Sequence, residues 1–187
     1  MARHQAKINR QLEPVHVDEQ RLWAPWRSAY LARTVRGGPQ RCIFCMRRLG
    51  QAALSRRLVL YEGPQAVVML NRYPYNNGHL MVAPRRHIAS PELLGREERT
   101  ILADLVAFAV ERLRTVLRPA AFNVGANLGR AAGAGFADHM HWHVVPRWEG
   151  DTNFMPVIAS TRVLSQHLEE SYALLAPHFK AIETALS

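Results

Sequence analysis

The 187-residue chain has few cysteines, almost no lysine and no long apolar segment. Two cysteines are too few for a small secreted scaffold held by several disulfides. No stretch approaches the roughly 18 to 20 apolar residues that cross a bilayer. Residues 1–14 lack the apolar core of a secretory signal. We therefore expect no membrane partner and a cytoplasmic location.

Arginine supplies nearly all of the positive charge. Lys and Arg total 24 against 15 Asp and Glu, for a formal net charge of +9, and only Lys7 and Lys180 are lysines. Guanidinium groups bind phosphate in a fork, so the charge suits nucleic acid or phosphorylated small molecules. No block of five like charges occurs, and basic residues do not interleave with aromatic ones. These absences argue against nucleic acid as the partner.

The length and the hydrophobic fraction of 48% fit one globular domain. Residues 1–20 are polar and without periodicity, which predicts a flexible N-terminal arm. Residues 21–187 are expected to form a single domain with a C-terminal helical extension.

Apolar runs bounded by Gly, Pro and Asn predict strands at 57–63, 65–71, 79–84, 121–127 and 139–146. Helical spacing predicts a long helix over 97–117, preceded by the start signal Ser90-Pro91-Glu92. A second helical pattern covers 163–175 and is interrupted at Pro177. Runs of strands with inserted helices, rather than strict alternation, predict an α+β domain with an antiparallel sheet of about five strands.

Histidines occupy every second position from His139 to His143. On a strand their imidazoles would share one face. Core or surface histidines bonded to carbonyls explain one such residue but not three. A three-histidine zinc site is awkward, because same-face neighbours on one strand lie about 7 Å apart.

Nucleophilic catalysis at phosphorus is the most specific of the three interpretations of the histidines from His139 to His143. A neutral imidazole attacks phosphorus, and a neighbouring imidazole or carbonyl can fix its tautomer. The Gly-rich loop 129–135 would let backbone amides reach phosphate oxygens.

Cys42 and Cys45 form a C-x-x-C pair. A disulfide is disfavoured in a reducing cytosol, and a redox pair would need a βαβ setting that this region lacks. Zinc needs two more ligands, for which His87 and His139 are candidates, and these four would close a tetrahedral structural site. Unligated thiols are the alternative.

The run from His139 to Val145, after a Gly-rich loop, resembles the histidine triad family of nucleotide hydrolases and transferases. The resemblance covers about residues 42–148. It includes 71–87, which is similar to the family's second motif with its Asn, Gly-His and Pro-x-x-His, and the C-x-x-C of zinc-containing bacterial members. The segments 22–27 and 147–156 resemble the subgroup of bacterial diadenosine tetraphosphate phosphorylases and hydrolases.

The resemblance implies catalytic roles for three histidines. His141 would be the nucleophile that takes the nucleotidyl group from the α-phosphate. His143 would contact that phosphate, and a backbone carbonyl near His139 would orient His141. His79 would support the triad by contacting its histidines rather than the substrate.

The resemblance also implies binding roles. Asn71 would lie near the ribose and Asn127 near the phosphates. Many relatives also place a polar donor just before the triad. Here either backbone amides around Gly133 to Gly135 take that role, or the leaving-group preference differs. Cys42, Cys45, His87 and His139 would hold a structural zinc ion. Family members commonly pair into homodimers by extending the sheet, so a homodimer is expected.

The function implied is cleavage of dinucleoside polyphosphates of the diadenosine tetraphosphate type through a covalent nucleotidyl-His141 intermediate. Phosphate as acceptor would make the protein a phosphorylase (ATP adenylyltransferase), and water a hydrolase. A purine nucleoside phosphoramidase of the same family and a non-catalytic nucleotide-binding module are the alternatives. Gly135 and Phe136 stand where many relatives have Gln, Ser or Thr, which bears on the leaving group.

Overall fold

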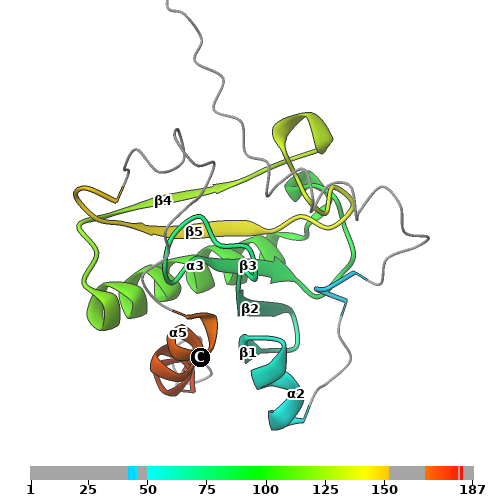
Figure 1. The fold of residues 1–187 in the computed structure, drawn as a ribbon. Coiled ribbons are helices and arrows are strands. Elements are labelled where there is room, and N and C mark those ends of the chain that lie inside the picture. The colour runs from blue at the N-terminus through cyan, green and yellow to red at the C-terminus, as the bar shows by residue number, and fades with distance from the viewer. Residues whose placement is uncertain (1–41, 46–49, 152–166, 181, 183–187) are drawn as a thin grey trace, which may run out of the picture.

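The computed structural model describes residues 42–45, 50–151, 167–180 and 182. Its elements follow in the order α2 (Gln51–Arg56), β1 (Val59–Glu62), β2 (Ala66–Leu70), β3 (Leu80–Pro84), η1 (Pro91–Leu93), α3 (Arg96–Leu117), β4 (Ala121–Ala126), η2 (Arg130–Ala132), β5 (Trp142–Arg147), α5 (Leu168–Leu175) and η3 (Ala176–Phe179) (Figure 1). The predicted arm at 1–20, the segment 22–27 and the start of the predicted second helix lie outside the described residues.

The strands form one sheet in the order β1-β2-β3-β5-β4, with every neighbouring pair antiparallel. This confirms the predicted α+β class and the five-stranded antiparallel sheet. All residues of β2 and β3 are buried, because both faces at the centre of the sheet are covered. β4 forms one edge, and none of its residues is buried.

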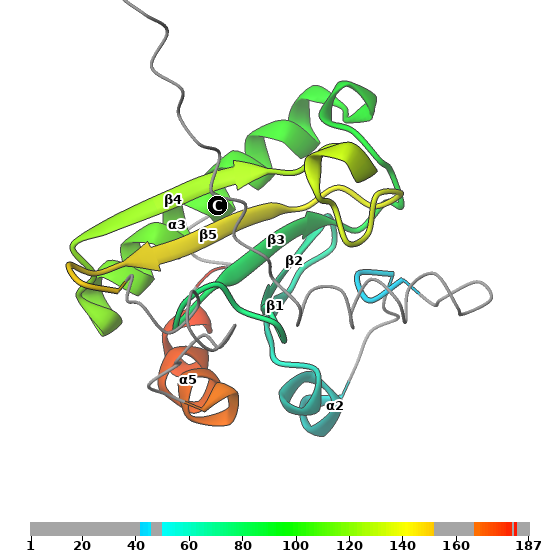
Figure 2. The ribbon, with the colours of Figure 1, turned by 45° about the horizontal axis from the view of Figure 1, so that its top comes forward.

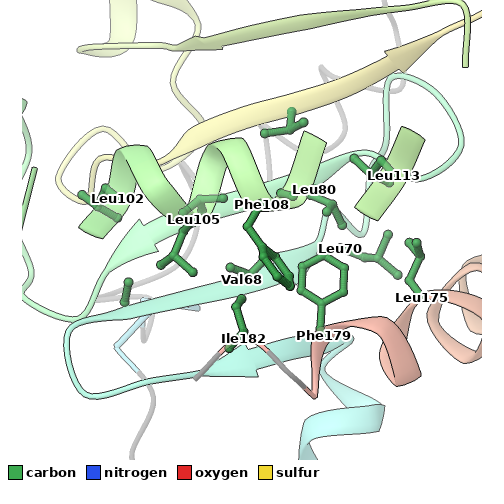
Figure 3. Packing of buried hydrophobic residues seen from close by; sticks show 14 of the residues in the cluster. Val68, Leu70, Leu80, Leu102, Leu105, Phe108, Leu113, Leu175, Phe179 and Ile182 are labelled. Atoms are coloured by element: carbon green, nitrogen blue, oxygen red, sulfur yellow. The ribbon is translucent and has the colours of Figure 1, made fainter. Parts of the chain in front are cut away.

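One face of the sheet carries the larger core. α3 runs across this face, and α5 packs at its lower end (Figures 1 and 2). Buried α3 residues recur every three or four positions, so they point inward together. Figure 3 shows side chains from α3, the sheet and the C-terminal elements meeting there, with these labelled: Val68, Leu70, Leu80, Leu102, Leu105, Phe108, Leu113, Leu175, Phe179 and Ile182. Each large apolar side chain buried in this way contributes roughly 1.5–3 kcal/mol.

The opposite face carries a smaller buried cluster and the histidines. Its members are Phe44, Val59, Val67, Met69, Met81 and Ala83. Val144 lies in the larger core and Trp142 packs against it, so alternation along β5 turns His143 to the other face. The site is therefore built on the face that α3 leaves uncovered.

The predicted histidine strand is shorter than expected at its start. β5 begins at Trp142, and His139 lies in a bend whose amide donates to the carbonyl of Phe136 at 3.3 Å. The Met140 amide donates to Ile88 at 2.7 Å instead of to a neighbouring strand. The first two histidines thus precede the strand, where the backbone can direct them to different tasks.

The helix-start signal at Ser90 begins only the 3-10 turn η1. Leu94 is extended and ends that turn, and α3 starts separately after Gly95. The Gly95 amide donates to the Glu98 carboxylate at 2.8 Å, which caps the long helix. No helix among the described residues combines the length and apolarity of a membrane span.

Candidate active site and metal centre

The imidazole of His141 is held by a hydrogen bond to the backbone of His139. Its Nδ1 lies 3.0 Å from the carbonyl oxygen of His139. A carbonyl only accepts, so Nδ1 carries the proton and Nε2 keeps its lone pair. Burial lowers the pKa of His141, although the hydrogen bond to His139 opposes this. A neutral imidazole with a bare Nε2 is the form that can attack phosphorus.

His79 and His143 form a second ordered pair. The backbone amide of Tyr75 donates to His79 Nδ1 at 3.1 Å, so the His79 proton sits on Nε2. That nitrogen lies 2.9 Å from His143 Nδ1 and donates to it. The His143 proton is therefore on Nε2, which makes this nitrogen a donor suited to a phosphate oxygen.

Hydrogen bonds hold the loop 71–79, which carries His79, in place. Asn71 lies with its amide nitrogen 3.4 Å from His79 Nδ1, and its side-chain oxygen accepts from the Tyr73 amide at 2.9 Å. The amide group of Asn76 donates to the Asp151 carboxylate at 2.7 Å and to the Pro146 carbonyl at 3.2 Å. These bonds fasten the loop to the far end of β5.

Four side chains from three separate chain segments meet beside this site. They come from the C-x-x-C segment, the turn after β3 and the bend before β5: Cys42, Cys45, His87 and His139. Their ligand atoms all lie within 4.8 Å of one another. Figures 1 and 2 both place the C-x-x-C segment next to the end of β3 and the start of β5.

The donor set suits zinc. His139 Nε2 donates to the Pro84 carbonyl at 2.9 Å, which leaves Nδ1 bare and facing the cluster. That Nδ1 lies 3.2 Å from Cys42 Sγ and 3.2 Å from His87 Nδ1. Ligand pairs around a tetrahedral zinc ion are separated by about 3.3–3.8 Å, given the usual Zn–N and Zn–S lengths.

Burial favours the uncharged forms of the cluster's side chains. Burial lowers the pKa of His139 to about 4, against its hydrogen bond to Pro84. Burial, helped by Cys42, raises the pKa of the Cys45 thiol to about 11. A divalent ion would bind the neutral imidazoles and hold the thiols as thiolates.

Two of the residues expected to bind substrate, Asn71 and Asn127, lie next to the histidines. Asn127 is one position beyond the last pair of the β4–β5 ladder, on the side of His141. Gly125 faces His143 across that ladder. The Gly133 amide donates to Arg130 at 2.9 Å within the loop, so this amide is already used. The binding roles of Asn71, Asn127, Gly133 and Gly135 stay predictions.

Two aromatic residues at the site were not singled out from the sequence. The Phe44 ring centroid lies 4.8 Å from that of His141, and the Tyr75 centroid lies 4.8 Å from that of His79. Phe136, at the position where relatives carry a polar donor, packs edge-on against Phe44 at 5.9 Å. Only the position of Phe44 inside the C-x-x-C offered a signal in the sequence.

Comparison with known proteins identifies the family. The HIT domain pattern matches residues 55–150. An AP-4-A phosphorylase of Mycobacterium tuberculosis is 40% identical over 161 residues, which are 84% of this chain and 83% of that protein. An adenosine 5'-monophosphoramidase of Schizosaccharomyces pombe is 31% identical, over 57% of this chain and 74% of that protein.

The solved structures agree. A Zn-bound histidine triad family protein from Mycobacterium smegmatis has a TM-score of 0.58 and 25% identity, covering 79% of this chain and 99% of that chain. The chain belongs to the HIT family, as its histidine run and second motif imply.

Proposed function

We propose that this protein cleaves dinucleoside polyphosphates of the diadenosine tetraphosphate type through a covalent nucleotidyl-His141 intermediate. The observation that carries the proposal is the pair of fixed tautomers in the triad. His141 presents a bare Nε2, and 4.8 Å away, centroid to centroid, His143 keeps a proton on its own Nε2. A nucleophile thus lies beside a donor for the phosphate that it attacks.

The chemistry has two steps. His141 Nε2 forms a bond to the α-phosphorus, the bond to the bridging oxygen breaks, and the remaining nucleotide leaves. An acceptor oxygen then attacks the same phosphorus and breaks the P–N bond, which returns the imidazole to its starting form. His143 donates to a non-bridging oxygen in both steps and stabilises the charge that develops there.

Phosphate is the acceptor that we favour. The relative that shares 40% identity over most of both chains is named AP-4-A phosphorylase. With phosphate, diadenosine tetraphosphate gives ADP and ATP. With water it gives AMP and ATP.

We also propose that Cys42, Cys45, His87 and His139 hold one zinc ion. A bound zinc ion would supply a fixed cross-link between three chain segments and no reaction chemistry, because all four ligand positions are taken by protein. Thiol ligands must stay reduced, which fits a location in the cytoplasm.

We further propose that two copies of the chain form a homodimer through the edge strand β4. β4 is an edge strand, and Val124 on it is 45% exposed. Such an edge offers backbone groups to a second copy.

The decisive experiment is chromatography of the products from diadenosine tetraphosphate, with and without inorganic phosphate. ADP plus ATP, formed only when phosphate is present, supports the phosphorylase. AMP plus ATP in its absence makes the protein a hydrolase. Faster turnover of an adenosine phosphoramidate than of the dinucleotide would contradict the proposed substrate class and favour the phosphoramidase.

The intermediate is tested with His141→Asn, which keeps a polar side chain but no nucleophile. We expect no turnover, a wild-type circular dichroism spectrum and no acid-labile nucleotide bound to protein after quenching. Normal turnover in this folded variant would eliminate the mechanism. Metal analysis should give one zinc per chain, and Cys45→Ser should lower that ratio.

A further inference from the structure

We propose that Phe44 is a positioning residue for His141 and that it couples the C-x-x-C segment to the nucleophile. The kinetic part of this inference rests on the proposed function. The structural part does not, because it concerns the orientation of one imidazole.

Phe44 lies between the two cysteines and touches both histidines that precede β5. Its ring centroid is 4.8 Å from that of His141 with 33° between the ring planes, and 5.1 Å from that of His139. The Phe44 side chain is fully buried. It therefore acts on the two imidazoles and not on solvent.

The position of Phe44 is fixed by the sheet below it. Phe44 belongs to the buried cluster that includes Val67, Met69 and Met81, on the face away from α3. Phe136 adds an edge-on contact at 5.9 Å. Because the ring is held from several sides, it forms a rigid surface on which His141 can rest.

His141 needs such a surface. Its hydrogen bond to the His139 carbonyl fixes one atom of the ring, but the ring can still pivot about that bond. A pivot moves Nε2 away from the line of attack on phosphorus. Contact with the face of Phe44 sets the plane of the imidazole and completes its orientation.

The hydrogen bond to His139 and the contact with Phe44 both connect His141 to the four-ligand cluster. The carbonyl belongs to His139, whose ring is a cluster member, and Phe44 lies between Cys42 and Cys45. The cluster thus orients the nucleophile through the backbone on one side and through an aromatic ring on the other.

A merely structural role would predict that Phe44 behaves like any buried phenylalanine. Phe179 is the matched control, since it is 1% exposed and packs edge-on against Phe108 in the core on the opposite face (Figure 3). Phe44→Leu and Phe179→Leu remove the same atoms. Both should lower the midpoint of thermal unfolding.

The test compares these variants as purified, metal-containing protein. We expect Phe44→Leu to lower kcat on diadenosine tetraphosphate about tenfold with KM changed less than twofold, and Phe179→Leu to keep kcat within twofold of wild type. Zinc content is measured for each sample. Phe44→Met, whose unbranched side chain adapts to an irregular cavity, gives the same comparison if the leucine variant does not fold.

Nitrogen-15 NMR of the imidazoles provides a readout that needs no substrate. In wild type we expect one sharp set of His141 signals for the Nδ1–H tautomer. In Phe44→Leu we expect the same tautomer with signals shifted and broadened by movement of the ring. An unchanged kcat and an unchanged His141 signal in folded Phe44→Leu would overturn the inference. A changed signal in a protein that never turns over the dinucleotide would support the inference while the proposed function fails.

Discussion

Backbone carbonyls assign opposite tautomers to two histidines only two positions apart. His139 keeps its proton on Nε2 because of Pro84, and so offers Nδ1 to the cluster. His141 keeps its proton on Nδ1 because of His139, and so offers Nε2 to phosphorus. One short segment before β5 can therefore serve both a metal centre and a nucleophile without competition between them.

His79 carries the proton that fixes the tautomer of His143. We expect His79→Leu to lower kcat roughly 10- to 100-fold, because His143 Nδ1 loses its donor and the proton on Nε2 is no longer specified. His79→Gln can still accept from Tyr75 and donate to His143, so it should recover part of the activity. Steady-state kinetics on folded proteins measures both effects.

The substitution series also separates a tautomer effect from a packing effect. His79 is fully buried, so His79→Leu changes stability as well as chemistry. Urea unfolding of both variants provides that control. Equal kcat values for the leucine and glutamine variants would contradict the idea that the hydrogen bond from His79 fixes the tautomer of His143.

Single residues were predictable from the sequence where their type and spacing restrict the chemistry. The C-x-x-C pair called for two more zinc ligands, and the four candidate residues do come together in the structure. The tautomers were not predictable, because the partners are backbone atoms brought close only by folding, such as the Pro84 carbonyl and the Tyr75 amide. The role of Phe44 was hidden for the same reason.

At the scale of elements, Gly78 lies where the loop that carries His79 packs against α3. Its φ of +69° is left-handed, and a Cβ there would run into Leu117 and lie 3.2 Å from Leu113 Cδ2. We expect Gly78→Ala to lower the free energy of unfolding by about 2 kcal/mol or more, from backbone strain and the clash. Urea denaturation measures this loss.

Gly125→Ala is the control for Gly78. A Cβ at Gly125 would meet open space, so stability should hold or rise by about 0.5 kcal/mol. Equal stability of the Gly78→Ala variant and wild type would show that the close approach of the loop to α3 is not required.

The start of α3 gives the protein an acid-sensitive contact. Hydrogen bonds from Arg86 and from the Gly95 amide lower the pKa of Glu98 to about 2. The folded pKa lies below the unfolded value of about 4.3. The stabilisation is therefore complete above that value and is lost as the pH falls from there toward 2.

Glu98→Gln should remove this pH dependence. The contact is at the surface, so we expect it to contribute less than about 1 kcal/mol near neutral pH. Unfolding free energies measured between pH 6 and 3 should fall less steeply for the variant than for wild type. Parallel curves would contradict a stabilising role for the charged carboxylate.

Sequence patterns located the elements but not all of their ends. Alternating and continuous apolar runs predicted all five strands, since their side chains face one or two buried layers. The long helix predicted over 97–117 starts at Arg96, but the signal at Ser90 begins a separate 3-10 turn, because Leu94 interrupts the two and the glutamate cap acts from Gly95. The short α2 was not predicted, since none of its residues is buried.

At the scale of the whole molecule, the sheet separates stability from chemistry. The core under α3 and α5 fills one face, and the histidines, the cluster and Phe44 occupy the other. β2 and β3 are buried on both sides and keep the two layers in register. Substitutions in the larger core should therefore lower the free energy of unfolding and leave kcat nearly unchanged. The Phe179→Leu variant tests this expectation.

At the scale of the whole molecule, the proposed homodimer predicts that the protein associates through the edge at β4. We expect the protein to sediment as a dimer and Val124→Glu to sediment as a monomer, because a carboxylate would be buried at the joined edges. Leu174→Glu is the control, since Leu174 on α5 is 43% exposed but lies away from that edge, and this variant should remain dimeric. A dimeric Val124→Glu protein would place the interface elsewhere. A change in both variants would instead indicate nonspecific association through exposed apolar side chains.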